Sequence, residues 1–422
     1  MTSPPATDIP LPSGPDRPPA PTRHVASPRQ LAWLDQQLTD WQAEGLLDEP
    51  TATALRARYV AHRRVTLARI VLTLGAAFVG IGLIWTVAAN LDTMSPLVRF
   101  LLVAAVWVGL VAVAEVLATR RERVGDTASP VVGAVRLLAA AAFGAVVFQA
   151  AQSLQVPAYE PVLVGVWALG VLAYAYAVVG LGPTVLGIGL AAYWLVWHAS
   201  ESTRTVLGLT TTVASAALLG VALGTGHQRL PERLREWRPL GLPWREVGAL
   251  LALGGLFFAA LPVGHDRGAV GATPWVALGV AVVLAAAAAV TGERLDRLEV
   301  GLAAGALVAV VGLGLWRTSG DLGSTSSLTA ADWARAVVAV LVYLAVTSGY
   351  AVLGGMRDSD RLTWAATAAL VLFTTVQAFA VFAPILSGAV LFLAVGVVLL
   401  ATGVLADRGR RRLVAEGREA RS

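Results

Sequence analysis

Between residues 67 and 406, long apolar runs follow one another with only short polar stretches between them. A bilayer core about 30 Å thick requires roughly 20 helical residues for each crossing. The runs reach that length, and they lack the alternation of polar and apolar residues that is typical of membrane barrel strands. The pattern therefore predicts spans near 67–89, 97–118, 134–154, 161–180, 183–199, 205–225, 245–263, 274–291, 299–316, 334–354, 362–382 and 385–406.

The segment before these runs has a different pattern. Residues 1–27 are rich in proline, which predicts a disordered tail. Residues 28–66 carry apolar residues at helical spacing and predict a short cytoplasmic helical hairpin. Gly45 is expected to end its first helix, and Asp48 to cap a second helix that runs through Leu55 and Tyr59 into Arg63 and Arg64.

The spans fall into two groups of about six, and the fold class that follows is all-α, a polytopic membrane helix bundle of about 12 transmembrane helices. The remaining boundaries are a first membrane group at 67–225, an Arg-rich cytoplasmic loop at 226–244, a second membrane group at 245–406 and a basic cytoplasmic tail at 407–422.

Arginine positions test the number and direction of the spans, because cytoplasmic loops of membrane proteins carry an excess of basic residues. Placing the N-terminus inside puts most arginines in segments that face the cytoplasm. The segments then predicted to face outward hold Arg99, Arg204, Arg267, Arg317 and Arg335. The asymmetry persists along the chain, which predicts an even number of spans in the plasma membrane with both termini cytoplasmic.

Composition agrees with this architecture and limits the kinds of partner and functional site that are expected. Of the 422 residues, 56% are hydrophobic and 14% charged, against about 25% charged in soluble proteins. The net charge of +5 is explained by orientation of the spans, so no nucleic-acid partner is expected. Cysteine is absent and the five histidines are scattered, so the sequence predicts no metal site, no cofactor and no catalytic residue.

Polar residues within spans are costly and are therefore examined individually. Glu115 and Arg136 lie near the cytoplasmic ends of neighbouring spans and form a candidate ion pair. The alternative is that both side chains reach the headgroup region separately. Elsewhere, the second half of the chain is expected to hold hardly any acids within the membrane, which argues against an ion-coupled carrier.

Gln149 and Gln152 are three residues apart and share one face of the third span, with Glu160 following. They form either the polar lining of an outward-facing cavity or hydrogen bonds that hold helices together. Asn90 ends the first span, and Asp92 follows it in a short outer turn. Asp92 would be the acid of a membrane glycosyl- or acyltransferase, although capping or solvation explains it more simply.

Two glycine pairs, Gly220 with Gly224 and Gly301 with Gly305, have the four-residue spacing that allows helices to approach closely. Other short motifs follow one another in the first half of the chain. They are Trp41-Gln-Ala-Glu-Gly45 followed by Leu-Leu, Gly75 to Gly82 leading to Ala89-Asn90, Ser95-Pro96, and Ala142-Phe143-Gly144 leading to Gln149 and Gln152. Over residues 30–200 this order resembles the bacterial predicted membrane proteins grouped as domain of unknown function 2157. The resemblance implies an architecture and raises interest in Asn90, Gln149 and Gln152, but it implies no activity.

These observations favour a non-enzymatic membrane protein that acts as a scaffold, sensor or assembly partner. Its partners would be the lipid bilayer and a cytoplasmic protein that binds residues 28–66, while its oligomeric state is left open. The alternative is a transporter or lipid-handling protein with a polar outward-facing cavity at Gln149, Gln152 and Glu160. The enzyme hypothesis, which depends on Asp92, has the least support.

Overall fold

The computed structural model describes residues 24–26, 28–61, 95–123, 130–155, 157, 160–261, 268–316 and 329–382, and the single positions 74, 75, 78, 82, 393, 396, 397 and 400. The predicted spans at 67–89 and 385–406 lie outside the described residues apart from those single positions, as do Asn90, Asp92 and the tail at 407–422. The chain divides into two units, residues 1–71 and 72–422, which are described separately.

The first unit contains two helices, α1 (Pro28–Ala43) and α2 (Glu49–Ala57). Gly45 follows α1 with a φ of 77°, a left-handed conformation that glycine adopts without steric cost. Asp48 is the N-cap of α2, and its carboxylate accepts a hydrogen bond from the Thr51 amide at 3.2 Å. Hydrogen bonding with Thr51 lowers the pKa of the Asp48 carboxyl below its ordinary value.

Two short strands flank these helices and correct the prediction made from the sequence. β1 (His24–Ala26) pairs in parallel with β2 (Tyr59–Ala61). Residues 24–26 were assigned to the disordered tail, and Tyr59 to the second helix, which instead ends at Ala57. The sequence His-Val-Ala pairs with Tyr-Val-Ala, so β-branched and aromatic residues lie in an extended pairing that a helix-based pattern does not reveal.

The second unit is a helix bundle. Its helices are α4 (Pro96–Arg123), α5 (Pro130–Ser153), α6 (Pro161–Ala177), α7 (Leu181–Ser202), α8 (Val206–His227), α9 (Gly241–Ala260), α10 (Ala272–Thr291), α11 (Arg294–Leu315), α12 (Ala330–Met356) and α13 (Asp360–Phe382), with a 3-10 helix, η2 (Glu232–Leu240), before α9. In the described part of the chain, eight helices are long and apolar enough to cross a membrane. The segment 226–244, which the sequence predicted as a loop, contains η2 and the start of α9.

Proline explains where several of these helices begin. Pro96, Pro130 and Pro161 are the first residues of α4, α5 and α6. At the first helical position proline loses no intrahelical hydrogen bond, and its fixed φ suits the helix. α12 begins differently, with a capping box in which Thr329 and Asp332 bond to each other's amides.

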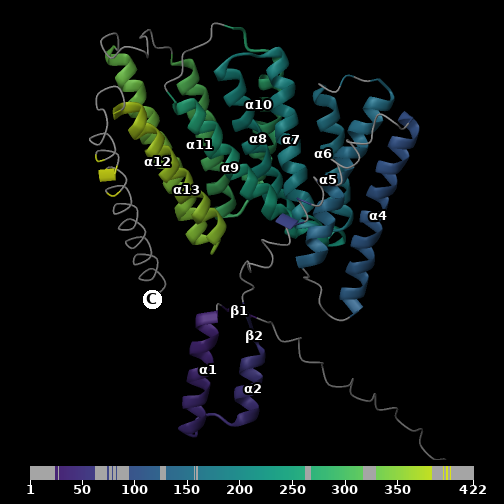
Figure 1. The fold of residues 1–422 in the computed structure, drawn as a ribbon. Helices are drawn as coiled ribbons and strands as arrows, with labels where there is room; N and C mark the ends of the chain where they lie inside the picture. The colour runs from purple at the N-terminus through teal and green to yellow at the C-terminus, as the bar shows by residue number, and fades with distance from the viewer. Residues whose placement is uncertain are drawn as a thin grey trace, which may run out of the picture. The chain divides into compact units, whose positions relative to one another are not determined.

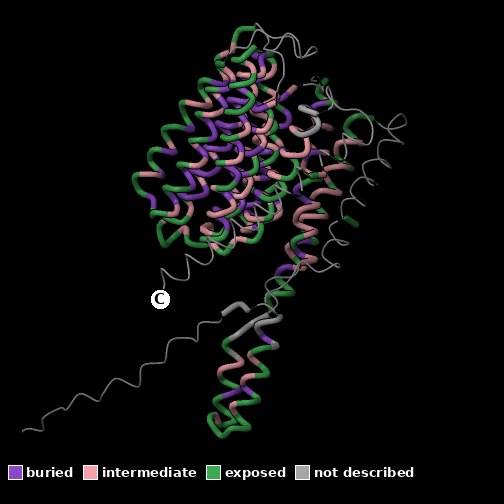
Figure 2. Tube along the Cα trace, turned by 90° about the vertical axis from the view of Figure 1, so that its left-hand side faces the viewer, coloured by how far each residue is buried: buried purple, intermediate pink, exposed green. Residues whose placement is uncertain are grey.

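The main core lies among α8 to α13, where alanine and leucine dominate the buried positions. Figure 2 shows these buried positions concentrated on the inward sides of the helices, with exposed residues on the outside. Aromatic rings fill one part of this core, where Tyr343 of α12 stacks on Phe373 of α13 with ring centroids 3.8 Å apart. α7 contacts α6 on one side and α8 and α9 on the other, linking α4–α6 to the main core (Figure 1).

The two glycine pairs have different surroundings. A Cβ at Gly224 of α8 would lie 2.7 Å from the carbonyl oxygen of Gly241, and a Cβ at Gly220 would lie 3.1 Å from that of Trp244. α8 and α9 therefore touch backbone to backbone, as small-residue motifs permit. A Cβ at Gly301 or Gly305 of α11 would meet no described atom within 4 Å. The same four-residue spacing therefore lies at a helix contact in α8, and on a face with no described neighbour in α11.

Candidate functional site

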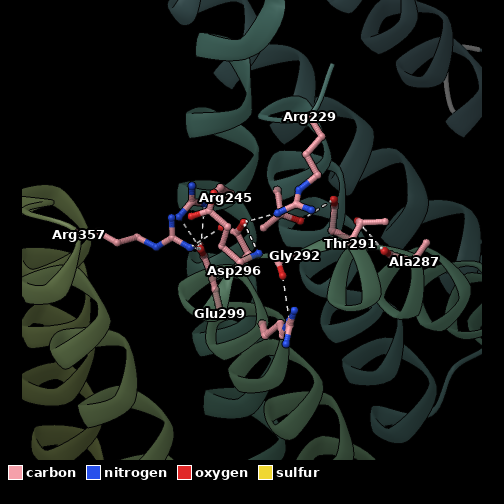
Figure 3. A network of polar contacts seen from close by, with 12 residues as sticks. Arg229, Arg245, Ala287, Thr291, Gly292, Asp296, Glu299 and Arg357 are labelled. Atoms are coloured by element: carbon pink, nitrogen blue, oxygen red, sulfur yellow. Dashed lines mark hydrogen bonds and ion pairs between the residues drawn. The ribbon is translucent and has the colours of Figure 1, made fainter. Parts of the chain in front are cut away.

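Polar side chains gather at one end of the helix bundle. The helices alternate in direction, so the ends of α8, α10 and α12 adjoin the beginnings of α9, α11 and α13 (Figure 1). Ion pairs between elements far apart in sequence occur there. We call the set Arg229, Arg245, Asp296, Glu299 and Arg357 the charged network, and the end of the bundle that holds it the charged end (Figure 3).

The centre of the charged network is a buried pair between α9 and α11. Arg245 donates from Nε at 2.9 Å and from Nη2 at 2.6 Å to Oε2 of Glu299. Their side chains are 6% and 2% exposed, so neither charge has more than slight access to solvent. A third nitrogen, Nη2 of Arg357 at the end of α12, lies 3.0 Å from the same oxygen. Such a pair is stabilising only when its remaining hydrogen bonds are satisfied.

Asp296 links the network to two further elements. Its Oδ1 accepts from Nη2 of Arg357 at 2.8 Å, and its Oδ2 accepts from Nη2 of Arg229 at 3.1 Å. The same carboxylate accepts from the Glu293 amide in the capping box that begins α11. Asp296 therefore takes part in the capping box of α11 and links α11 to the segment after α8 and to the end of α12.

Local sequence explains why the two acids point to the same place. Asp296 and Glu299 are three residues apart in the first turns of α11, which puts them on one face. Acidic residues are also favoured in the first turn of a helix, where the macrodipole is positive. Arg357 follows the last residue of α12, and Arg245 lies in the second turn of α9. The charges thus meet because four helix ends meet.

A pocket of about 290 Å³ opens beside this network. Arg245, Glu299 and Arg357 form its polar wall, and Leu242 and Leu362, from the first turns of α9 and α13, form apolar parts of the wall. Glu246 also lines it and pairs with the exposed Arg361 at 3.1 Å. The pocket therefore combines paired charges with the beginnings of two helices.

The predicted partners Glu115 and Arg136 lie together in the structure. Arg136 of α5 donates from Nη2 at 2.6 Å and from Nε at 3.0 Å to the two carboxylate oxygens of Glu115 on α4. Tyr174 of α6 donates to the same carboxylate at 3.0 Å, and Arg136 also reaches the Val178 carbonyl oxygen at 3.1 Å. This half-buried cluster fastens α4, α5 and α6 to one another at the end where α4 finishes.

A third cluster at the charged end joins α6, α8 and α9. Nδ1 of His227 lies 2.6 Å from the Leu223 carbonyl oxygen, and because a carbonyl only accepts, this nitrogen carries the proton. In the neutral imidazole Nε2 then accepts from the Tyr176 hydroxyl at 2.6 Å. That hydroxyl in turn accepts from Nε1 of Trp244 at 2.9 Å. The chain of bonds is complete without an external group.

The glutamines and the glutamate expected to line an outward cavity do not share one environment. Gln149 is buried, Gln152 is exposed although both are on α5, and the half-buried Glu160 is the N-cap residue of α6. These residues line neither the pocket beside Glu299 nor a second one beside Glu115. Gln377 on α13 donates to the Ala260 carbonyl oxygen at 3.3 Å, so it holds the end of α9.

Asp296 and Glu299 are acids of the second half, where the sequence analysis expected hardly any within the membrane. Both are buried within a helix that is apolar enough to cross a membrane. The sequence signal was the three-residue spacing of two acids at the start of an otherwise apolar run. Arg335, counted among the outward arginines, is also buried and donates to the carbonyl oxygens of Leu313 and Ala259 at the ends of α11 and α9.

Comparison with known proteins confirms the resemblance seen in the sequence. Residues 39–182 match the family model described as predicted membrane protein (DUF2157). The matched segment ends at the second residue of α7, so it includes the Glu115–Arg136 cluster and excludes the charged network. No curated protein matches the chain, and no solved structure matches it.

Proposed function

We propose that this chain is a non-enzymatic protein of the bacterial plasma membrane that serves as a scaffold, sensor or assembly partner. In this proposal it has about twelve spans, and its charged end faces the cytoplasm together with both termini. Ten of those spans correspond to α4–α13, and the sequence at 67–89 and 385–406 supplies the other two. Residues 28–61, which include α1 and α2, are then available to a cytoplasmic protein.

One observation carries the proposal, namely that Glu115, Asp296 and Glu299 are each paired, at helix ends, with arginines from other elements. Glu299 with Arg245 and Glu115 with Arg136 each join two or more helices. Between the helix ends, the core of α8–α13 is mainly apolar and rich in small residues, and the polar side chains buried there, such as Ser215 and Thr347, are uncharged. Pairing of this kind fixes the arrangement of helices, which is what a scaffold or an assembly surface requires.

A transporter or lipid-handling role is the second candidate. It is favoured by the pocket that reaches Glu299, a buried acid within an apolar helix. Ionisable residues in such positions often mark a pathway through a membrane protein. The outward-facing cavity first expected at Gln149 and Gln152 has less support, because the two side chains differ in burial.

Thiol labelling tests the two candidates, since the chain contains no cysteine and each introduced one is unique. Gln149→Cys, Gln152→Cys and the buried control Ala366→Cys would be treated from outside with a membrane-impermeant thiol reagent. For a scaffold we expect Gln149→Cys to react as slowly as Ala366→Cys, while the exposed Gln152→Cys reacts. Rapid reaction at Gln149→Cys in well-expressed protein would instead favour the carrier.

The orientation has its own test at the end of α4, where Arg121 follows the last apolar turn. Arg121→Cys should be unreactive in intact cells and reactive once the membrane is opened. Reaction of Arg121→Cys in intact cells would show the opposite orientation in the membrane and would leave the scaffold proposal unaffected.

A further inference from the structure

Two arginines at the end of α4 have no ionic partner among the described residues. Arg120 and Arg123 are exposed, and neither side chain makes a hydrogen bond or an ion pair with any residue that the structure describes. They are three residues apart, which puts them on one face of the helix. In the charged network, by contrast, every arginine is paired with a carboxylate. The guanidinium groups of Arg120 and Arg123 are therefore free to bind an external anion.

The second pocket, of about 330 Å³, opens on this face of α4. Its wall is formed by residues of this one helix, which are Glu115, Val116, Thr119, Arg120 and Arg123. The carboxylate of Glu115 already accepts from Arg136 of α5 at 2.6 and 3.0 Å. When Arg136 and the exposed Glu122, whose charge acts on Arg136, are included, three arginines stand against two acids. The pocket therefore offers two unpaired positive charges, and its own acid is already neutralised.

The same face of α4 is apolar along the rest of the helix. α4 lies at the edge of the bundle and, among the described helices, packs on α5 (Figure 1). Away from that contact, exposed apolar side chains lead at helical spacing to the two arginines, and they are Val98, Leu102, Val113 and Val116. At 1.5 Å per residue, the face from Val98 to Val116 is about 27 Å long, close to the thickness of a bilayer core. The arginines therefore lie where this apolar face leaves the membrane.

We infer that this face of α4 binds an anionic phospholipid, with the phosphate at Arg120 and Arg123 and an acyl chain along Val113 and Val116. The planar fork of arginine presents several donors to a phosphate, and basic residues at the membrane surface attract anionic headgroups. A zwitterionic lipid fits the apolar face equally well, but its ammonium group would meet two arginines. The inference goes beyond the proposed function and requires only that α4 crosses the membrane, in either direction.

The probe is phosphatidylglycerol with a photoreactive diazirine in its acyl chain, added to the full chain in detergent micelles. Mass spectrometry of peptides after illumination locates the lipid adducts. We expect adducts on α4 at and around Val113 and Val116, which unlabelled phosphatidylglycerol removes by competition and an equal amount of phosphatidylcholine does not. Equal competition by the two lipids would overturn the inference. Adducts that avoid α4 would also overturn it, because another segment or a second copy of the chain would then cover this face.

The double variant Arg120→Gln with Arg123→Gln should weaken binding of phosphatidylglycerol at α4 by roughly 10- to 30-fold, because two basic residues no longer contact the headgroup. Arg233→Gln with Arg235→Gln is the matched control, because it removes the same two charges from η2, where both side chains are exposed. We expect the control to bind at α4 as the natural chain does. Equal weakening in the two double variants would mean that overall charge attracts the lipid, which would overturn the inference.

A further pair of changes separates loss of charge from loss of structure. Arg120→Lys with Arg123→Lys alters the same exposed positions as the glutamine variant but keeps both positive charges. We expect it to bind phosphatidylglycerol within about threefold of the natural chain, because lysine also holds a phosphate as a point charge. Binding as weak as in the glutamine variant would show that these charges do not hold the headgroup and would overturn the inference.

Discussion

Replacing Glu299 by glutamine removes the negative charge from the buried centre of the charged network. The Glu299 side chain is 2% exposed, and its Oε2 lies within 3.0 Å of nitrogens from both Arg245 and Arg357. Arg357 retains Asp296 at 2.8 Å, but Arg245 retains no other ionic partner among the described residues. The variant therefore leaves one buried guanidinium without a directly paired carboxylate.

Breaking one side of a buried ion pair costs about 3–5 kcal/mol, mainly because the remaining charge stays desolvated. Arg245→Met should cost a similar amount, because it leaves the buried Glu299 carboxylate without its main partner. Glu299 then has only Arg357, which also pairs with Asp296. The double variant Arg245→Met with Glu299→Gln removes both charges and should be far less destabilised than the two single changes together. We expect a coupling free energy of at least about 2–3 kcal/mol.

The assay is reversible unfolding of the purified protein in mixed micelles, which gives the free energy of unfolding for each variant. The pair of Glu246 with Arg361 is the internal control, because the Arg361 side chain is 71% exposed. Breaking this exposed pair should cost less than about 1 kcal/mol. If the two changes at Arg245 and Glu299 were additive within about 0.5 kcal/mol, the pair would not be the buried interaction described here.

Three further changes test other parts of the structure. Gly224→Ala should destabilise the bundle by about 1–3 kcal/mol in the same unfolding assay, because its Cβ meets the backbone of α9. Gly305→Ala, whose Cβ would have no described atom within 4 Å, should not; equal effects would refute the α8–α9 contact. Asp48→Ala should lower the protection of the Thr51 amide against hydrogen exchange, while Asp48→Asn preserves it. In the natural chain that protection, corrected for the intrinsic exchange rate at each pH, should be lost as pH falls below the ordinary carboxyl pKa and through the lowered folded one. Arg335→Leu should lower the unfolding temperature, because two buried carbonyl groups lose their donor; an unchanged temperature would contradict that bonding.

The periodic part of the fold could be predicted from the sequence because its causes are local. A run of apolar residues long enough to cross a bilayer is helical whatever its neighbours are, since no water is available to satisfy its backbone. Prolines such as Pro96 and Pro161 mark the first residue of a helix by their own geometry. The cap at Asp48 and the stop at Gly45 are equally local, and both were predicted correctly. The Glu115–Arg136 pair could be proposed because α4 and α5 are consecutive antiparallel helices.

The features that could not be predicted from the sequence depended on which helices become neighbours. Spacing alone put Asp296 and Glu299 on one face, but the partner Arg245 lies 54 residues before Glu299 and belongs to another helix. The two glycine pairs have the same local pattern, yet one meets α9 and the other meets no described atom. Helix order in the sequence does not determine lateral packing, because apolar helices in lipid gain little from choosing one apolar neighbour over another. The lengths of the apolar runs therefore determined the spans, whereas the tertiary structure decided which helix ends meet. The charged network and its pocket follow from that packing.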